Sequence, residues 1–246
     1  MFSDCDIKGS QLPTKTLCLT YDDGPGPHTA ELGRYLFEQG IQAAFFVIGR
    51  HAEHQQATLR HLRNWGHLIG NHTYSHPGLV ALAESGGDVV DELVRTDAII
   101  RPFLSGGIAL FRAPYGNWRQ KLHLDSSEDK PVSLVAEILN RCAALWHYIG
   151  PVNWDISAED WDFWTQGLPA ERCVQRYLEI ISRKQRGIVL MHDSSEDEAV
   201  RAKNGALQAT QLLVPALRQQ GYRFVGLNSI PQICKARSVL TSRAAL

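Results

Sequence analysis

The amino-acid sequence predicts an α/β protein in which strands and helices alternate, and three observations support this fold class. Short apolar runs recur along the chain and are separated by longer stretches with helical periodicity. Several of those stretches end at glycine, as at Gly40 and Gly66, which is typical of helix C-termini. The chain has 246 residues, of which 44% are hydrophobic, so it can bury a substantial core. This alternation predicts parallel strands that form either an open doubly wound sheet or a barrel.

The predicted strands are apolar runs in which β-branched and aromatic residues are frequent. In order, they cover residues 16–21, 43–48, 67–71, 108–112, part of 146–154, 187–192 and 222–227. The predicted helices place apolar side chains on one face, as Leu32, Tyr35 and Leu36 do in the first of them. These helices cover residues 29–39, 52–65, 88–103, 134–145, 170–183 and 206–220.

Two polar stretches interrupt the alternation, and each of them follows a strand. Residues 116–131 and 194–205 are both predicted to be surface loops. The tail after Ile233 has no partner in the pattern and is expected to be frayed. No repeat, low-complexity tract or linker marks a boundary, so residues 1–246 are predicted to form a single domain with its core over about 16–233.

The composition gives no sign of a nucleic-acid or membrane partner. The chain has 25 basic and 26 acidic residues and a formal net charge of −1, so no basic footprint for nucleic acid or anionic lipid is expected. No apolar run is long enough for a transmembrane helix. The oligomeric state stays open.

The location of the protein is predicted from its first residues and its cysteines. The first residues lack the basic and apolar regions of a secretory signal. The five cysteines are scattered and form no CxxC motif, which is typical of free thiols in a reducing compartment. A cytoplasmic location is expected, and the alternative is a secreted protein whose signal peptide is absent from this sequence.

Most of the chemically informative residues lie where a predicted strand ends. The first strand runs into Asp22 and Asp23, and a Gly-Pro turn follows, so two carboxylates of different orientation lie at one strand exit. The third strand runs into His72 and His76, which share one face if the segment makes a helical turn, as two ligands of one metal would. Pro77 disfavours helical geometry at His76, so we expect a single turn or a loop there.

Three further strand ends carry ionisable side chains. Arg112 ends the fourth strand and could bind a carboxylate, Asp160 follows the fifth, and His192 ends the sixth. In a parallel barrel the carboxyl ends of all strands face one side, where active sites assemble. Two imidazoles and one carboxylate would leave an open position on a catalytic metal. The remaining carboxylate and imidazole would then be available as a base and an acid.

Five motifs occur in order at these strand ends, namely TYDDGP, HTYSH, RAPYG, DISAEDW and LMH, over residues 20–192. In this order they resemble the motifs of the polysaccharide deacetylase family, also called carbohydrate esterase family 4 or the NodB homology domain. The segments AAFFVIG, FRAPYGNW and LLVPAL are most similar to chitooligosaccharide deacetylases. The resemblance implies a distorted (β/α) barrel with about seven parallel strands in a single domain, with a carbohydrate as its substrate.

The resemblance also implies a metal centre and a base. Asp23, His72 and His76 are expected to bind a divalent metal, with zinc favoured and cobalt or nickel as alternatives. Asp22 is expected to be the general base, and Arg112 is expected to orient it.

An acid and a set of substrate contacts are implied in the same way. His192 is expected to be the general acid, paired with Asp160. The backbone N–H of Tyr115 is expected to bind the oxyanion, while Trp161 and Leu190 are expected to line a pocket for the acetyl methyl group.

One position departs from the family pattern. The first aspartate of the family's DxxDW motif is Ser157 in this chain, although Asp160 and Trp161 are present. Asp155 lies two residues before Ser157 and could compensate. We expect changed loop packing or changed substrate contacts at this position, and not a loss of the chemistry.

The implied activity is that of a hydrolase that removes the N-acetyl group from N-acetylglucosamine-type sugars and releases acetate, acting on carbon–nitrogen bonds other than peptide bonds. An O-acetyl esterase and a hydrolase of small non-sugar amides stay open as alternatives on the same site. An inactive carbohydrate-binding module is disfavoured because the base and all three metal ligands are present. The glycan, its length and the position deacetylated stay open, and residues 116–131 are expected to shape the substrate groove.

Overall fold

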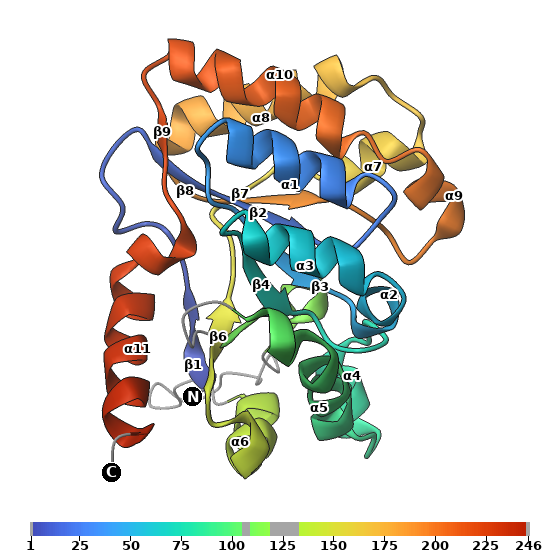
Figure 1. Ribbon diagram of the computed structural model, residues 1–246, viewed down its shortest axis with the longest axis vertical. Helices are drawn as coiled ribbons and strands as arrows, with labels where there is room; N and C mark the ends of the chain where they lie inside the picture. The colour runs from blue at the N-terminus through green and yellow to red at the C-terminus, as the bar shows by residue number, and fades with distance from the viewer. Residues whose placement is uncertain (1, 105–108, 119–132, 245–246) are drawn as a thin grey trace, which may run out of the picture.

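The computed structural model describes residues 2–104, 109–118 and 133–244, which form a curved parallel sheet surrounded by helices (Figure 1). The strands are β1 (Phe2–Ile7), β2 (Thr16–Asp22), β3 (Ala44–Val47), β4 (Leu68–Asn71), β5 (Ala109–Phe111), β6 (Tyr148–Val152), β7 (Ile156–Ser157), β8 (Arg186–His192) and β9 (Arg223–Phe224). The α-helices are α1 (Thr29–Glu38), α2 (Gly49–Glu53), α3 (Gln56–Asn64), α4 (Leu79–Glu84), α5 (Val89–Ile100), α6 (Leu134–Asn140), α7 (Asp160–Thr165), α8 (Ala170–Lys184), α9 (Glu198–Ala202), α10 (Ala206–Gln219) and α11 (Pro231–Ala244).

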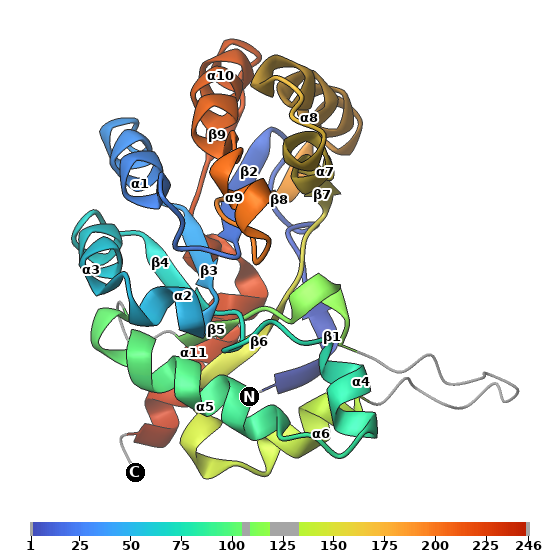
Figure 2. The same ribbon diagram turned by 90° about the vertical axis from the view of Figure 1, so that its right-hand side faces the viewer.

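All strand pairings in the described part of the chain are parallel. The strand order is β1-β6-β5-β4-β3-β2-β8-β7, with β9 beside the start of β2. Among the described residues β1 and β7 end this order without pairing to each other, so the twisted sheet curls into a half-barrel and does not close. Figure 2 shows α1, α3, α8 and α10 on the outside of the curl. The predicted distorted (β/α) barrel is confirmed.

The strand β2 is buried on both of its faces, which explains why consecutive apolar residues occur in it, as at Leu17, Cys18 and Leu19. Leu17, Leu19 and Tyr21 pack in the core between the sheet and helices α1, α8 and α10. Cys18, which points the opposite way, packs in a second core inside the curl with Phe46 of β3. Packing on both faces therefore fixes the position of β2, including that of its last residue, Asp22.

Each predicted strand segment contains a strand, but β1 and β7 were not predicted. The sequence of β1, FSDCDI, has no regular alternation, and the strand joins the sheet edge beside β6, with Phe2 opposite Gly150. The ring of Phe2 stacks on Tyr148 with a centroid distance of 5.9 Å, a long-range contact that local sequence does not reveal. The strand β7 contains only two residues, so it is too short for a periodic signal.

The single helix predicted over residues 52–65 is wrong, because the structure has two helices, α2 and α3, in that region. The chain leaves helical geometry at Gln55, with φ −129° and ψ 37°. The side-chain amide of Gln55 donates a hydrogen bond of 2.7 Å to the carbonyl of Pro25, which belongs to the loop after β2. A contact between distant segments therefore accompanies the break.

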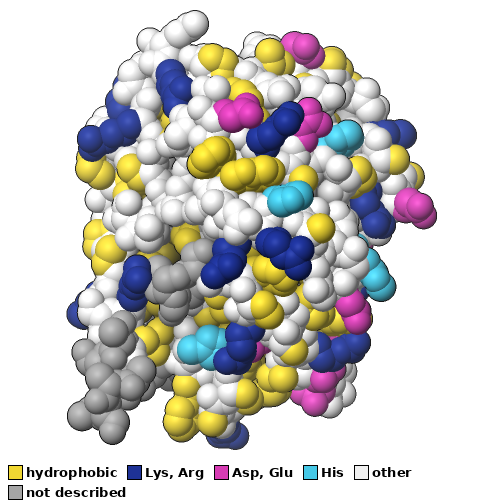
Figure 3. Space-filling model, viewed as in Figure 1, with side chains coloured by type: hydrophobic (Ala, Val, Ile, Leu, Met, Phe, Trp, Pro, Cys, Tyr) yellow, Lys and Arg dark blue, Asp and Glu magenta, His cyan; other side chains and the backbone are white. Residues whose placement is uncertain are grey.

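The prediction of a frayed tail after Ile233 is wrong as well. The tail belongs to α11, and Ile233 is fully buried in the inner core beside Leu227 and Ile230. Residues 194–205 contain the short helix α9, whereas most of the predicted loop over residues 116–131 lies outside the described residues. No described helix is both long and apolar enough to cross a membrane. Figure 3 shows positive and negative side chains interspersed on the face that it draws, in keeping with the formal net charge of −1.

Candidate active site

The carboxyl ends of four strands, β8, β2, β4 and β5, bring most of the predicted site residues together, with β3 between β2 and β4. In the β2–β8 pair Asp22 lies opposite His192, and each is the last residue of its strand. The strand β4 ends at Asn71, directly before His72, and the N–H of Arg112 donates to the carbonyl of Asn71 (3.1 Å) where β5 ends. Residues far apart in sequence thus meet because parallel strands all end on the same edge.

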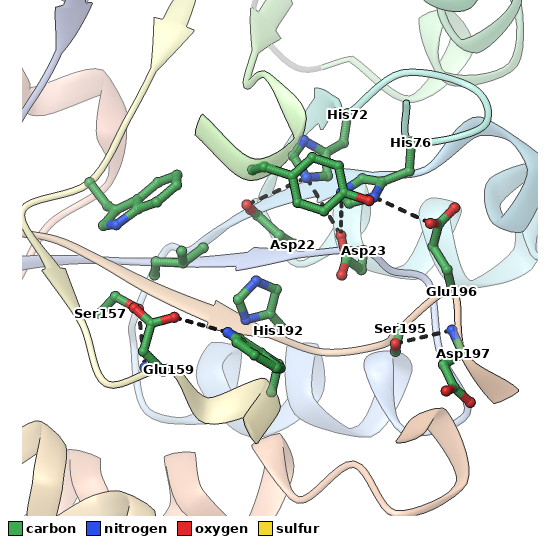
Figure 4. A pocket seen from close by; sticks show the side chains of 14 residues that line it. Asp22, Asp23, His72, His76, Ser157, Glu159, His192, Ser195, Glu196 and Asp197 are labelled. Atoms are coloured by element: carbon green, nitrogen blue, oxygen red, sulfur yellow. Dashed lines mark hydrogen bonds and ion pairs between the residues drawn. The ribbon is translucent and has the colours of Figure 1, made fainter. Parts of the chain in front are cut away.

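These strand ends surround a cavity of about 540 Å³ (Figure 4). The cavity is lined by Asp22, Asp23, His72, His76, Tyr115, Trp154, Ser157, Glu159, Trp161, Leu190, His192, Ser195, Glu196 and Asp197. Eight of the ten predicted site residues are in this lining, and the other two, Arg112 and Asp160, are buried behind it and each bonds a lining residue.

The carboxylate of Asp22 is fixed by a buried guanidinium. Arg112 is 1% exposed and donates from Nη1 to Asp22 Oδ1 at 2.7 Å and to Thr20 Oγ1 at 2.9 Å. Its Nε donates to the carbonyl of Val152 at 3.0 Å, which sets the guanidinium plane. Burial raises the pKa of Asp22, and the positive charge of Arg112 opposes that rise. The pair therefore places a carboxylate with a fixed orientation at the cavity wall.

Asp23, His72 and His76 form a compact cluster of metal-ligand type. Asp23 Oδ1 lies 3.5 Å from His72 Nε2 and 3.3 Å from His76 Nε2, and it has no hydrogen-bond partner among the described residues. Burial lowers the pKa of His72 to about 3 and that of His76 to about 2, so both imidazoles are neutral at pH 7. Neutral imidazoles and a carboxylate are the donor set of a zinc-type site. These residues fit a divalent metal.

The backbone around the cluster adopts left-handed conformations that residues other than glycine seldom take. Asp23 and His76 have φ values of 72° and 62°, and the N–H of His76 donates to Thr73 Oγ1 at 3.0 Å. The segment between His72 and His76 is a turn and not a helix, as Pro77 predicts. His72 Nδ1 lies 2.8 Å from the carbonyl of Arg112, an interaction that leaves Nε2 free for a metal.

A second imidazole–carboxylate pair lies at the end of β8. His192 Nδ1 is 2.7 Å from Asp160 Oδ1, and the backbone N–H of His192 donates to Asp160 Oδ2 at 2.8 Å. Burial alone would lower the pKa of His192, but the charge and hydrogen bond of the buried Asp160 raise it to about 10. His192 is therefore cationic at neutral pH.

The departure at Ser157 does not bring Asp155 to the site. Asp155 Oδ2 accepts hydrogen bonds from the N–H of Gly9 (2.7 Å) and of Ile188 (2.8 Å), four residues before His192 along β8. Ser157 lines the cavity, and its Oγ accepts from the N–H of Glu159 at 3.2 Å. The position therefore contributes to a turn at the cavity wall, while Asp160 alone pairs with the imidazole.

Three predicted substrate contacts form the walls of the cavity. Tyr115 is 67% exposed, has φ 58°, and packs its ring edge-on to His76 with a centroid distance of 4.6 Å. Trp161 is 48% exposed, and its indole N–H donates to Glu159 at 2.9 Å, whereas Leu190 is 4% exposed at the cavity floor. Two exposed aromatic rings therefore line the cavity, and that of Tyr115 lies against an imidazole of the cluster.

Several residues of the site were not predicted from the sequence. Five of them line the cavity, namely Trp154, Glu159, Ser195, Glu196 and Asp197. The other two are the buried Asp193 and His51, whose Nδ1 lies 2.8 Å from the carbonyl of Asp23. Asp193 accepts from Thr29 Oγ1 and lies so close to Gly24 that a Cβ there would collide with its carboxylate. The acidic residues directly after the LMH motif were a sequence signal that could have pointed to Asp193, Glu196 and Asp197.

The fold thus brings a carboxylate held by a guanidinium, an imidazole held by a carboxylate and a cluster of metal-ligand type to one cavity. The profile of the family described as polysaccharide deacetylase matches residues 9–131. The chain belongs to this family, and the deacetylases among its relatives support a hydrolytic deacetylase.

Relatives of this chain cover most of its length. A chitooligosaccharide deacetylase of Azorhizobium caulinodans is 29% identical over 216 residues, which cover 84% of this chain and 90% of that protein. A peptidoglycan-N-acetylglucosamine deacetylase of Bacillus cereus is 26% identical over 222 residues, covering 90% of this chain and 70% of the relative.

Solved structures with the same fold include both an enzyme and an inactive relative. The crystal structure of a peptidoglycan N-acetylglucosamine deacetylase in complex with an N-oxidanyl-benzamide has a TM-score of 0.69 and 25% identity, covering 92% of this chain and 91% of that one. A pseudoenzyme of carbohydrate esterase family 4 from Bacillus anthracis has a TM-score of 0.68 at 21% identity, covering 93% of this chain and 69% of that one. Because a pseudoenzyme shares the fold, the side chains of the site decide the activity.

Proposed function

We propose that this protein is a metal-dependent N-deacetylase that removes the N-acetyl group from N-acetylglucosamine-type sugars. The observation that carries the proposal is the placing of an oriented carboxylate, Asp22, and a cationic imidazole, His192, in one cavity with the cluster of metal-ligand type. Amide hydrolysis needs a group that takes a proton from water and a group that gives one to the leaving nitrogen. The names of the relatives supply the class of sugar.

Asp23, His72 and His76 would hold the metal, with zinc as the first candidate and cobalt or nickel as alternatives. When bound, such a metal polarises the amide carbonyl and lowers the pKa of water. The neutral imidazoles and the unpartnered Asp23 Oδ1 support this assignment, because ligand atoms must offer free lone pairs.

The side chains would divide the proton transfers between them. Asp22, held by Arg112, takes a proton as water adds to the acetyl carbon. The backbone N–H of Tyr115 stabilises the negative charge on the carbonyl oxygen. The carbon–nitrogen bond then breaks, and His192 gives its proton to the sugar nitrogen while Asp160 balances the charge of the imidazolium. The products are acetate and a free amino sugar.

A short, soluble oligosaccharide is the substrate that the cavity suits best. Its volume of about 540 Å³ accommodates one or two sugar rings. The exposed rings of Tyr115 and Trp161 offer faces on which pyranose rings can stack. The chitooligosaccharide relatives match over most of their own length, which favours the same substrate class here.

An acetate-release panel tests this function. The purified protein is loaded with zinc and given N-acetylglucosamine, chitooligosaccharides, peptidoglycan fragments, acetylated xylan and a nucleotide sugar. We expect acetate from the chitooligosaccharides, loss of that activity with a chelator, and its return when zinc or cobalt is added back. Release from acetylated xylan alone would favour the O-acetyl esterase instead, and full activity of the metal-free protein would contradict the metal assignment.

A further inference from the structure

Glu196 lies at the cavity on the segment between β8 and α9, and each of its oxygens faces a basic side chain. Oε1 forms an ion pair with Arg50 of α2, and Oε2 lies 3.4 Å from Nδ1 of His76 (Figure 4). The side chain is 30% exposed, whereas that of His76 is 8% exposed. A carboxylate from one side of the cavity thus reaches an imidazole that comes from the other.

The two imidazoles of the cluster differ in what faces their Nδ1 atoms. His72 Nδ1 lies 2.8 Å from the carbonyl of Arg112, a hydrogen-bonding distance. His76 Nδ1 is buried and has no hydrogen-bond partner among the residues that the structure describes. The carboxylate of Glu196 faces it at an ion-pair distance, slightly too long for a hydrogen bond. An imidazole that binds a metal through Nε2 carries its proton on Nδ1 and requires an acceptor there.

We propose that Glu196 is the carboxylate that positions His76 for metal binding, accepting the Nδ1–H and so directing Nε2 toward Asp23. This inference rests on the metal-dependent function proposed above and adds to it a residue outside the ligand set. A shift of about half an ångström would bring the pair to hydrogen-bonding distance. A carboxylate behind a ligand imidazole fixes its tautomer and strengthens it as a ligand.

The position of Glu196 is itself secured from α2. Arg50 binds the other carboxylate oxygen, and the backbone N–H groups of Gly49 and Arg50 donate to the carbonyls of Thr73 (2.8 Å) and Tyr74 (3.1 Å). These two carbonyls belong to the turn that carries His76. Arg50, which binds Glu196, is therefore attached through its backbone to the segment that carries His76.

The test is the affinity of the metal-free protein for zinc, measured by competition with a chromophoric chelator and without any sugar. Glu196→Ala removes the acceptor and should weaken zinc binding at least about tenfold, in the range seen when such partners are lost. Glu196→Gln keeps an oxygen that can accept and should recover part of the affinity. Glu198→Ala removes a carboxylate from the exposed first turn of α9 and should stay within about twofold of the parent.

Two further measurements separate positioning from folding and from chemistry. The thermal unfolding midpoint of the metal-free Glu196→Ala variant should match that of the parent, and Arg50→Ala should weaken zinc binding less than Glu196→Ala does. The visible spectrum of the cobalt-loaded Glu196→Ala variant should differ from that of the parent, because the orientation of one ligand changes.

Zinc binding by Glu196→Ala within twofold of the parent, or an equal loss in Glu198→Ala, would overturn the inference. The failure of the proposed function gives a different pattern. In that case zinc binds and depends on Glu196, but no acetylated sugar in the panel releases acetate.

Discussion

Asp22 and Asp23 are neighbours in the chain and both face Nε2 of His72, at 3.6 Å and 3.5 Å, but their other partners differ. Asp22 Oδ1 is bound by Arg112 at 2.7 Å, whereas Asp23 Oδ1 faces the Nε2 atoms of His72 and His76. A carboxylate tied to a guanidinium keeps one oxygen for proton transfer. A carboxylate between two neutral imidazoles is available for a metal, so single substitutions should separate the two roles.

The first prediction concerns this pair. Asp22→Asn should retain zinc and lower kcat by about 10²–10⁴-fold, because it removes a general base but no ligand. Asp23→Asn should bind zinc more weakly, since an amide is a poorer ligand than a carboxylate. Metal content after dialysis and the rate of acetate release are measured for both variants. If Asp22→Asn is the variant that loses zinc, the two roles are exchanged.

The second prediction concerns the pH dependence of the acid. Burial alone would lower the pKa of His192, but Asp160 raises it to about 10. The imidazolium therefore persists well above pH 7 and is lost as the pH rises through that pKa. Asp160→Asn removes the negative charge, lowers this pKa, and should move the alkaline limb of the kcat profile down by at least about one pH unit.

Asp155→Asn is the matched control for the acid. Its carboxylate bonds the backbone at Gly9 and Ile188, so the substitution should lower stability without moving the alkaline limb. A limb that shifts in Asp155→Asn and not in Asp160→Asn would contradict the assignment of the pair.

At the scale of elements, α11 completes the inner core of the half-barrel. Ile233 is fully buried with Leu227 and Ile230 against residues of the inner strand faces, and Ala236 and Leu240 pack beside them. Figure 1 shows the helix beside β1 and β6. The C-terminal helix should therefore contribute to the stability of the sheet itself.

The third prediction tests that contribution. Ile233→Ala deletes a fully buried side chain and should lower the free energy of unfolding by about 2–4 kcal/mol. Val239→Ala on the same helix removes a side chain that is 42% exposed and should change it by less than about 0.5 kcal/mol. Urea unfolding of the parent and both variants gives the comparison. If both substitutions change the free energy of unfolding by the same small amount, α11 does not unfold cooperatively with the sheet.

At the scale of the whole molecule, the cavity sets which substrates can reach the site. The cavity has a volume of about 540 Å³ and is lined by the exposed rings of Tyr115 and Trp161 and by the proposed base and acid, Asp22 and His192. A single short chain can enter such a space with one or two rings, whereas a chain packed in an insoluble polymer must first be detached from its neighbours.

The fourth prediction follows from this difference. A short N-acetylglucosamine oligomer should release acetate at least about tenfold faster, per mole of acetyl groups, than colloidal chitin or intact peptidoglycan. The zinc-loaded protein is compared on the three substrates at equal acetyl content, with Asp22→Asn as the blank. A clear preference for either polymer would defeat the short-substrate proposal while leaving the reaction itself in place.

Much of the fold was predictable because apolar periodicity is a local property. The apolar run around Leu17 and Leu19 marks a strand, and Leu32 and Leu36 mark the helix that covers it. The strand β1 and the helix α11 were missed because their places depend on distant partners. Phe2 stacks on Tyr148, and Ile233 closes a core built by other strands.

The sequence by itself determined which side chains end each strand, and with them the class of chemistry, because a parallel sheet sends all its carboxyl ends to one edge. Only the tertiary structure decided which partner each group has. Asp160 and not Asp155 pairs with His192, and Glu196 reaches His76 from a segment that reads as a surface loop. Those pairings depend on distances of a few ångströms between segments far apart in the chain, and neither periodicity nor motif spacing encodes such distances.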